Sequence, residues 1–262
     1  TKWVRDLTSV EELYLRGAYF GELKDLAGMR RLRSLTLDGV GIDVDLSVAP
    51  DFPELASLEI RHCNVRQAAL LNKFPKLTRF ALYDGEIDDP RAVYELTNLT
   101  SLALRPRAEG GYRALGGLEA LAQLKNLTEL DWGGRAGKLE SVENFPMLER
   151  LNLSGAKVKS LEELGSLGAL GTLDVSNNTF SKIPDLSSLA NLETLSMTGS
   201  KIKDFSNLST LPRLTHATLQ GDRIADAEQL SFAQALYAVQ LVDEIHSERQ
   251  EEQLAAAQLA VA

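Results

Sequence analysis

The side chains that could do chemistry are few and scattered in this chain of 262 residues. The three histidines, His62, His216 and His246, belong to different stretches, and no metal-binding or nucleophile motif surrounds them. The adjacent carboxylates of Asp88–Asp89 and Glu251–Glu252 are ordinary for a solvated loop or helix face. We therefore expect no catalytic residue, no metal site and no cofactor, and we expect that the protein is not an enzyme.

Composition narrows the possible partners and surroundings. Cys63 is the single cysteine, so no internal disulfide can form, which favours a reducing compartment such as the cytoplasm, with a secreted effector as the alternative. We expect Cys63 to be a small packing residue. A hydrophobic content of 44% without any long apolar run predicts a globular chain with no membrane insertion. The formal net charge of -9 argues against nucleic acid as the main partner.

A recurring apolar pattern must position any functional side chain. Pairs of apolar residues one position apart return along the whole chain, and most successive pairs are 22 residues apart. Self-similarity at this period is the signature of a solenoid. The pairs are Leu13/Leu15, Leu35/Leu37, Leu58/Ile60, Phe80/Leu82, Leu102/Leu104, Leu130/Trp132, Leu151/Leu153, Leu173/Val175, Leu195/Met197, Ala217/Leu219 and Val239/Leu241.

Each repeat combines two periodicities. The alternating pair, usually preceded three residues earlier by a leucine, indicates a short strand with side chains on opposite faces. Between the strands the apolar residues are three apart, as in Ile202, Phe205, Leu208 and Leu211, which is typical of tight helical turns. The sequence thus predicts one strand and one return segment in each coil.

The LxxLxL runs resemble those of the leucine-rich repeat family, especially its 22-residue, internalin-like and phosphatase-regulator-like type. The resemblance covers roughly residues 4–245 and is clearest in LSSLANLETLSMTGSKIKDFSNLSTLPRLTHATLQGDRI. It implies an α/β solenoid, a leucine-rich repeat horseshoe of about eleven coils with a parallel sheet on the concave face and short 3-10 or helical turns on the convex face. The resemblance also makes a bacterial origin an expectation.

One column of the repeat departs from the family. Three residues after the second apolar residue of each strand the family commonly has asparagine, whose side chain satisfies the backbone of the turn. Here only Asn178 conforms, and small residues are common in that column. We expect neighbouring coils or water to satisfy the turn backbone instead, and the coils at Arg107 and Arg135 to be the least regular.

We expect one solenoid over residues 1–245, with two interruptions. The step between Leu102 and Leu130 is 28 residues, so a loop is inserted at 105–117, either on the binding face or as a tolerated surface loop. Residues 246–262 abandon the repeat, and the capping pair Ser247 and Gln250 followed by alanines predicts a C-terminal helix, a cap or a linker.

The residues expected on the concave face differ between the two halves. The C-terminal half has mostly short polar residues, whereas the N-terminal half is rich in the tyrosine and arginine that dominate binding hot spots. We predict a partner site there, in which Arg61, Tyr83 and Arg105 form one column leading to the inserted loop. The predicted site residues are Tyr14, Arg16, Glu59, Arg61, Arg79, Tyr83, Arg105, Arg107, Tyr112 and Arg113.

The arginines suggest a protein partner with an acidic surface. The alternative is that they pair with nearby acids such as Asp38, Glu59 and Asp84 and contribute little to binding. The predicted function is a protein–protein interaction module that binds a partner on its concave face, as the resemblance implies. An inhibitor or immunity-type protein that blocks a toxin or enzyme, the targeting domain of a larger bacterial effector enzyme, and a purely structural role remain as alternatives.

Overall fold

The computed structural model describes residues 7–17, 22–40, 43–107, 115–136, 139–202, 204–219 and 238–241. The predicted C-terminal helix at 246–262 and the predicted site residues Tyr112 and Arg113 lie outside these ranges. The chain divides into two compact units, Thr1–Gly134 and Arg135–Ala262, which are described separately as unit 1 and unit 2.

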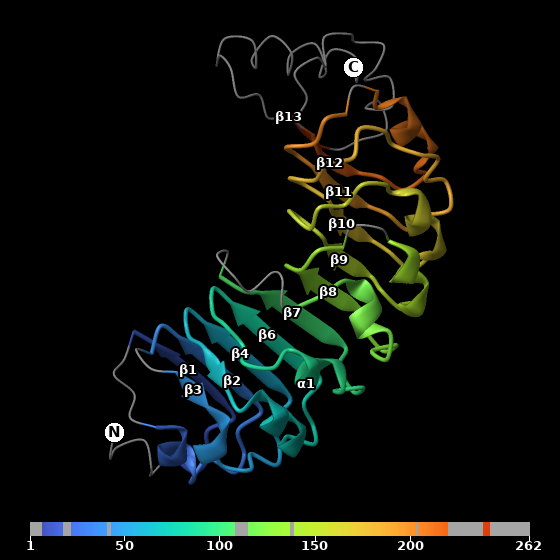
Figure 1. Ribbon diagram of the computed structural model, residues 1–262. Helices are drawn as coiled ribbons and strands as arrows, with labels where there is room; N and C mark the ends of the chain where they lie inside the picture. The colour runs from blue at the N-terminus through green and yellow to red at the C-terminus, as the bar shows by residue number, and fades with distance from the viewer. Residues whose placement is uncertain are drawn as a thin grey trace. The chain divides into compact units, whose positions relative to one another are not determined.

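Unit 1 contains a parallel main sheet in which each strand pairs with the strand of the next coil. The strand order is β1-β2-β4-β6-β7-β8, and equivalent residues face each other in register, as Leu35 faces Leu58 (Figure 1). Two very short strands, β3 and β5, pair separately. The strands are β1 (Glu12–Arg16), β2 (Ser34–Asp38), β3 (Val44–Asp45), β4 (Ser57–Arg61), β5 (Val65–Arg66), β6 (Arg79–Tyr83), β7 (Ser101–Arg105) and β8 (Glu129–Trp132).

Short helical turns form the return segments of unit 1, as the three-residue spacing predicts. They contact one another from coil to coil and leave the core between themselves and the sheet. Among the described residues of this unit all but one of them are 3-10 helices. They are η2 (Leu23–Leu26), η3 (Leu46–Val48), η4 (Ala68–Lys73), the α-helix α1 (Arg91–Tyr94) and η5 (Leu118–Leu121).

Unit 2 repeats the same plan. Its strands pair in the order β9-β10-β11-β12-β13, again parallel and in register. The strands are β9 (Arg150–Asn152), β10 (Thr172–Asp174), β11 (Thr194–Met197), β12 (His216–Leu219) and β13 (Ala238–Leu241). The described 3-10 helices are η6 (Glu140–Asn144), η7 (Glu162–Ser166) and η8 (Ser206–Thr210).

The core consists of the apolar pairs and the three-spaced leucines identified in the sequence. Leu58 and Ile60 on β4, for example, are 2% and 0% exposed, whereas Glu59 between them faces outward. Trp132 takes a leucine position in the coil lengthened by the inserted loop, is fully buried, and packs against Tyr94 with ring centroids 6.4 Å apart. The larger indole thus helps to fill a coil that is longer than its neighbours.

The position three residues after the second apolar residue of each strand is called the turn column here. The backbone groups of this turn find hydrogen-bond partners in two ways. Asn178 is 4% exposed, its side-chain nitrogen donates to the carbonyls of Leu153, Val175 and Ser176, and its Oδ1 accepts from Val158 N. Where asparagine is missing in unit 1, the backbone of the next coil takes part, as in the 2.7 Å hydrogen bonds from Val44 N to Asn64 O and from Val65 N to Glu86 O. The expected help from neighbouring coils is therefore confirmed.

The two arginines of that column mark local departures, also as expected. Arg107 and Arg135 are exposed, whereas their neighbours Pro106 and Ala136 are buried. At these coils the chain therefore turns inward one residue earlier or later than in the other repeats.

Candidate functional site

The outward-facing strand positions of unit 1 form one continuous surface, which we call the open face. Its side chains alternate with the buried ones along each strand, because successive residues of a strand point to opposite sides of the sheet. The open face is the concave face of the expected horseshoe. The predicted site residues that lie on it are Tyr14 and Arg16 of β1, Glu59 and Arg61 of β4, Arg79 and Tyr83 of β6, and Arg105 of β7. Arg107 directly follows β7 and is exposed.

Arg61, Tyr83 and Arg105 form the predicted column. The sheet register pairs Arg61 with Tyr83 and Tyr83 with Arg105 on consecutive strands. Since neighbouring strands are about 4.8 Å apart, the column extends over roughly 10 Å. The guanidinium carbon of Arg61 lies 4.7 Å from the centroid of the Tyr83 ring, which is a cation–π arrangement.

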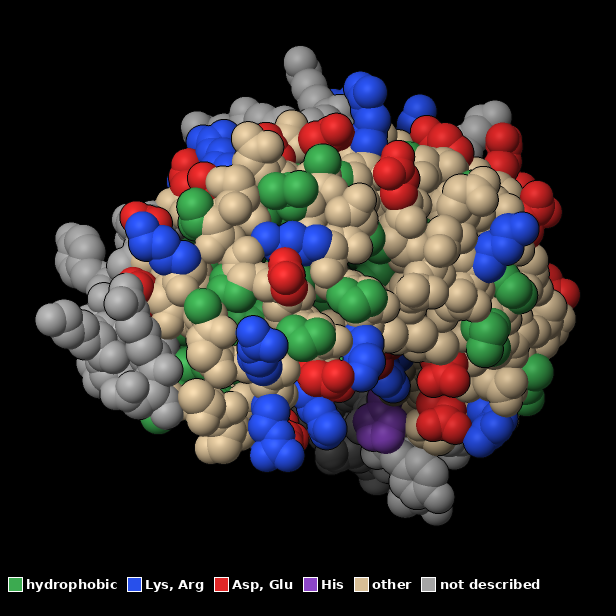
Figure 2. All heavy atoms as spheres, turned by 90° about the horizontal axis from the view of Figure 1, so that it is seen from below, with side chains coloured by type: hydrophobic (Ala, Val, Ile, Leu, Met, Phe, Trp, Pro, Cys, Tyr) green, Lys and Arg blue, Asp and Glu red, His purple; other side chains and the backbone are tan. Residues whose placement is uncertain are grey.

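Every arginine of these strands lies against a carboxylate of the same face. Arg61 pairs with Glu59 on its own strand, and Arg105 Nε pairs with Asp131 Oδ1 on β8. Arg79 Nη2 lies 3.3 Å from Glu129 Oε2, and Arg16 Nε lies 3.5 Å from Asp38 Oδ2. Figure 2 shows the same interspersion of basic and acidic side chains on the face that it presents. The open face is therefore richly charged without a large excess of one sign.

The burial of these pairs differs. The side chains of Arg61 and Glu59 are 44% and 29% exposed, whereas Arg105 and Asp131 are 21% and 25% exposed. Ala81 and Ala103, which stand between the longer side chains on the same face, are each only 7% exposed. The charged side chains thus lie beside small alanines on the same face, and their ion pairs hold them in defined positions.

A polar network centred on Asp38 borders the column. Its carboxylate accepts hydrogen bonds from Tyr14 Oη at 3.0 Å and from His62 Nδ1 at 2.7 Å. His62 Nε2 lies 3.6 Å from Asp84 Oδ2, and the Asp84 carbonyl accepts from Arg107 Nη2 at 3.3 Å. The network links five successive coils, those of β1, β2, β4, β6 and β7.

His62 and Asp84 occupy an unusual backbone conformation. Both have positive φ, 54° and 51°, at the position after the strand where Gly17 and Gly39 each have a φ of 57°. Non-glycine residues are uncommon in this region, although aspartate and histidine tolerate it better than most. The fold therefore accepts some backbone strain to place an imidazole and a carboxylate beside the Arg61–Tyr83 pair.

The environment sets the protonation of two groups at the surface. Burial raises the pKa of the Tyr83 phenol, and the nearby charges of Asp131 and Glu59 raise it further. The hydrogen bond from His62 lowers the pKa of the Asp38 carboxyl, and the bond from Tyr14 acts in the same direction against burial. At neutral pH Tyr83 is therefore a neutral hydrogen-bond donor and Asp38 is a carboxylate.

Sequence reasoning did not identify Glu129 and His62 as members of this surface. Glu129 reaches Arg79 across one intervening strand, and Ser101 Oγ on that strand also donates to it at 2.9 Å. The equal steps of the repeat did contain the signal, because they place Arg79, Ser101 and Glu129 in one column. A search for opposite charges one or two coils apart would have found the pair.

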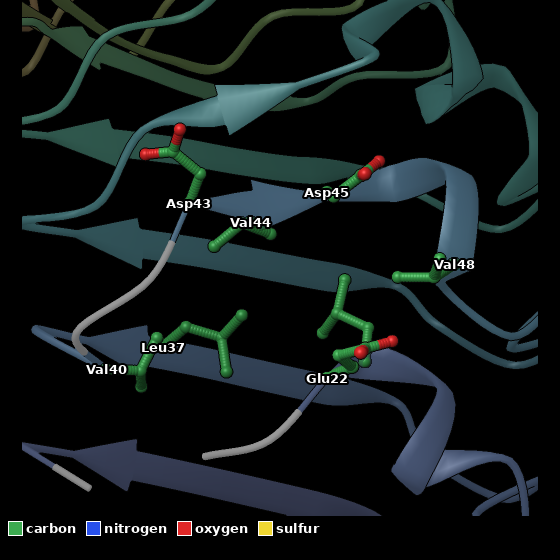
Figure 3. A pocket seen from close by; sticks show the side chains of 8 residues that line it. Glu22, Leu37, Val40, Asp43, Val44, Asp45 and Val48 are labelled. Carbon is green, nitrogen blue, oxygen red and sulfur yellow. The ribbon is translucent and has the colours of Figure 1, made fainter. Parts of the chain in front are cut away.

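The small cavity of unit 1 offers little room for small-molecule chemistry. A cavity of about 40 Å³ lies among Leu23, Leu37, Val40 and Val44, and Asp43 and Asp45 point away from it (Figure 3). This volume suits a water molecule rather than a ligand. Within the described residues no group of three or more side chains could hold a metal ion. The same residues include no helix with the length and hydropathy needed to cross a membrane.

A comparison of the sequence with known protein families supports the repeat seen in the structure. Residues 169–210 match the family model for leucine-rich repeats in two copies. No curated protein matches the sequence significantly. The other described coils continue the plan of the matched repeats, so the chain has the leucine-rich repeat fold.

Solved structures share this fold at low sequence identity. The internalin InlF of Listeria monocytogenes is 22% identical with a TM-score of 0.64, over 85% of this chain and 64% of its own. A leucine-rich repeat protein of Leptospira interrogans is 15% identical with a TM-score of 0.60, over 100% of this chain and 86% of its own. The receptor kinase ectodomain GASSHO1/SCHENGEN3 of Arabidopsis thaliana, in complex with Casparian strip integrity factor 2, is 18% identical with a TM-score of 0.57, over 93% of this chain and 31% of its own. The internalin likeness expected from the sequence is therefore confirmed at the level of the fold.

Proposed function

We propose that this protein is a protein-interaction module that holds a partner protein on the open face of unit 1. The observation that supports this most is the Arg61 guanidinium seated on the Tyr83 ring, in one column with Arg105. Leucine-rich repeat structures are typical binding scaffolds, and the plant ectodomain cited above is in complex with a partner factor. The proposed contact residues are Tyr14, Arg16, Glu59, Arg61, Arg79, Tyr83, Arg105 and Arg107, together with Tyr112 and Arg113, which lie outside the described residues.

The physical case is that these side chains are large, suited to hot spots and already ordered. Tyrosine and arginine bury much area and make directed hydrogen bonds, which is why they dominate interface energetics. Ordering a long arginine side chain on binding costs free energy, and the ion pairs with Glu59 and Asp131 reduce that cost because the guanidiniums are already held. A partner thus meets a surface that is largely set before contact.

The chemistry of the partner follows from how firmly each arginine is held. The Arg61–Glu59 pair is partly exposed, and exposed ion pairs contribute little to stability. A carboxylate of the partner can therefore displace Glu59 and form a forked pair with Arg61 at small cost. We accordingly propose a partner with acidic side chains around an apolar contact for Tyr83, rather than a uniformly acidic surface.

Capture from the lysate of the source organism tests the proposal. The immobilised wild-type chain is compared with a variant in which Arg61, Tyr83 and Arg105 are alanine. Its matched control replaces Ser196, Thr198 and Thr218 by alanine, residues of the strand region of unit 2 with intermediate exposure. We expect the wild type and the control to retain the same protein, and the affinity of the first variant for it to fall at least about tenfold.

The outcomes separate the possibilities. Equal retention by all three chains would place the partner elsewhere and overturn the proposed site. Retention lost only in the control would move the site to unit 2. If the retained protein is an enzyme or toxin, its activity in the complex shows whether binding also inhibits it.

A further inference from the structure

Two aspartates of unit 1 are each followed by a glycine, in the pairs Asp38–Gly39 and Asp84–Gly85. Asp38 ends β2, and Asp84 directly follows β6. An aspartate–glycine pair can rearrange spontaneously, because glycine has no Cβ to keep the carboxyl carbon of the aspartate away from the next peptide nitrogen. By sequence alone the two pairs are similarly reactive, so a difference between them comes from the fold.

The fold holds both reacting groups of the Asp38–Gly39 pair. The Asp38 side chain is 12% exposed, and its carboxylate accepts the hydrogen bonds from Tyr14 and His62. The Gly39 nitrogen donates to Arg61 O at 2.9 Å and is therefore already engaged. The bond from His62 also keeps the pKa of the Asp38 carboxyl low, which leaves little of the protonated form from which a hydroxyl can depart. Rearrangement here requires local opening of the turn.

The Asp84–Gly85 pair is held much less firmly. The Asp84 side chain is 65% exposed, and His62 Nε2 lies 3.6 Å from its carboxylate, beyond hydrogen-bond distance. Among the described residues Gly85 N donates to no backbone carbonyl. The peptide nitrogen thus has no hydrogen bond to lose, and the exposed carboxyl has access to the water that the reaction needs.

We propose that Asp84 is a site of spontaneous modification, at which a succinimide forms and opens to isoaspartate, while Asp38 is protected. The Gly85 nitrogen attacks Asp84 Cγ, so that an N–Cγ bond forms and the Cγ–OH bond breaks, and the hydroxyl leaves as water with the amide proton. One water molecule then opens the ring. Attack of this water at Cγ restores aspartate, whereas attack at the other ring carbonyl leaves the main chain running through Cγ, which is isoaspartate.

The modification has a structural consequence because it lengthens the backbone of a tight turn. Isoaspartate adds one methylene to the main chain directly before Gly85, which packs against Cys63 O too closely for a Cβ. The same turn is bonded to the next coil, since Arg107 N donates to Gly85 O at 3.2 Å. We expect isoaspartate at position 84 to loosen this turn, to lower the melting temperature and to displace Tyr83, the preceding residue of the open face.

Ageing of the full chain tests the assignment. The folded protein and a sample unfolded in guanidinium chloride are incubated at physiological temperature, and isoaspartate is located by isoaspartyl methyltransferase labelling followed by peptide mapping. In the folded chain we expect isoaspartate to accumulate at least about tenfold faster at Asp84 than at Asp38, because Asp38 reacts only when its hydrogen bonds open. In the unfolded chain the two positions should react at similar rates.

Two variants assign the label to its residue. Asp84→Glu keeps the carboxylate, but its longer side chain closes a ring on the next nitrogen far more slowly, so the label on this peptide should disappear. Asp51→Glu changes another exposed aspartate of unit 1, which precedes a phenylalanine, and is the matched control that should be labelled as the wild type is. The melting temperatures of the fresh chains check that both variants fold.

The proposal is overturned if the folded chain is labelled at Asp38 as fast as at Asp84, or if neither is labelled while both react in the unfolded chain. A label that persists in Asp84→Glu would place the modification on another residue. The aged chain should melt below the fresh one and recover in part when the methyltransferase and S-adenosylmethionine return isoaspartate to aspartate. An unchanged melting temperature would contradict the loosened turn.

These readouts need no partner. A loss of partner capture on ageing is also expected, because Tyr83 belongs to the proposed contact residues. That part rests on the proposed function. If the label appears at Asp84 and capture is unchanged, the modification stands and the role of Tyr83 in binding is contradicted.

Discussion

The outward-facing residues of the two units differ, although the coils beneath them are alike. In unit 1 the open face has long charged and aromatic side chains that pair across strands, such as Arg105 with Asp131. In unit 2 the corresponding positions are mostly short and turn back to their own chain, as when Asn152 Oδ1 accepts from Ser154 N at 2.9 Å. Because the buried leucines are the same in both units, the fold does not require this difference. The surface of unit 1 is therefore the better candidate for a partner.

The turn column shows a second difference between the units. In unit 2 Asn178 satisfies four backbone groups with one side chain. In unit 1 the equivalent residue of β6 is Gly85, whose hydrogen atoms leave room for the carbonyl of Cys63 in the preceding coil. The two units thus close the same turn either with a side chain or by close backbone packing.

The largest expected effect is a loss of folding stability when a leucine of the apolar core, which both units share, is truncated. Replacing Leu151 of β9, which is 2% exposed, or Leu58 of β4, also 2% exposed, by alanine should destabilise the protein by about 2–5 kcal/mol. The reason is the same in both, namely lost burial and a residual cavity in a continuous core. Denaturant unfolding measures it, and an effect below 1 kcal/mol in either variant would show that the inward and outward assignment is wrong there.

Asn178→Ala should lower the free energy of unfolding by nearly as much, about 2–3 kcal/mol, because it leaves several buried backbone groups without a hydrogen-bond partner. Asn126→Ala is the control, since that exposed side chain makes one hydrogen bond, to Thr97 O at 3.0 Å, and should cost under about 1 kcal/mol. Similar losses in both would mean that water replaces the Asn178 side chain.

Gly85→Ala should destabilise unit 1 by about 1–3 kcal/mol through overpacking. A Cβ at Gly85 would lie only 1.9 Å from the carbonyl oxygen of Cys63, so the backbone of one coil has to move. Gly168→Ala is the matched control in unit 2, where nothing lies within 4 Å of the added carbon. Thermal melts of the two variants compare them, and equal melting temperatures would contradict the close packing of this turn.

A smaller effect concerns pH. The folded-state pKa of Asp38 is lowered by the hydrogen bond from His62, so this group contributes stability that is fully present above its unfolded pKa of about 4. That contribution is lost as the pH falls through the lower, folded-state pKa. The stability advantage of the wild type over Asp38→Asn should therefore shrink as the pH falls below about 5. Melts at several pH values measure it, and a constant difference would show that the network does not stabilise the carboxylate.

Much of the fold could be predicted from the sequence, because the apolar core residues of a repeat protein recur at a fixed spacing along the chain. The apolar pairs became the buried strand residues, and the three-spaced leucines became 3-10 turns. The column of Arg61, Tyr83 and Arg105 could also be predicted, since a step of 22 residues fixes the register of parallel strands.

The pairing of the surface charges was harder to foresee. Whether Arg61 turns to Glu59 or to a neighbouring strand depends on side-chain rotamers, which the period does not determine. The left-handed backbone of His62 and Asp84 was not predicted either, although glycine at equivalent positions such as Gly17 and Gly39 is typical of positive φ. The function of the predicted site remains a proposal, since the residues that specify the fold are not those that would specify a partner.

The central claim is most directly tested by photo-crosslinking. Benzoylphenylalanine replaces Tyr83 in one chain and Thr218, on the equivalent face of unit 2, in another, and both are irradiated with the partner retained in the capture experiment. We predict a crosslink to the partner from position 83 and little or none from position 218. Crosslinking from position 218 with none from position 83 would contradict the assignment of partner binding to unit 1.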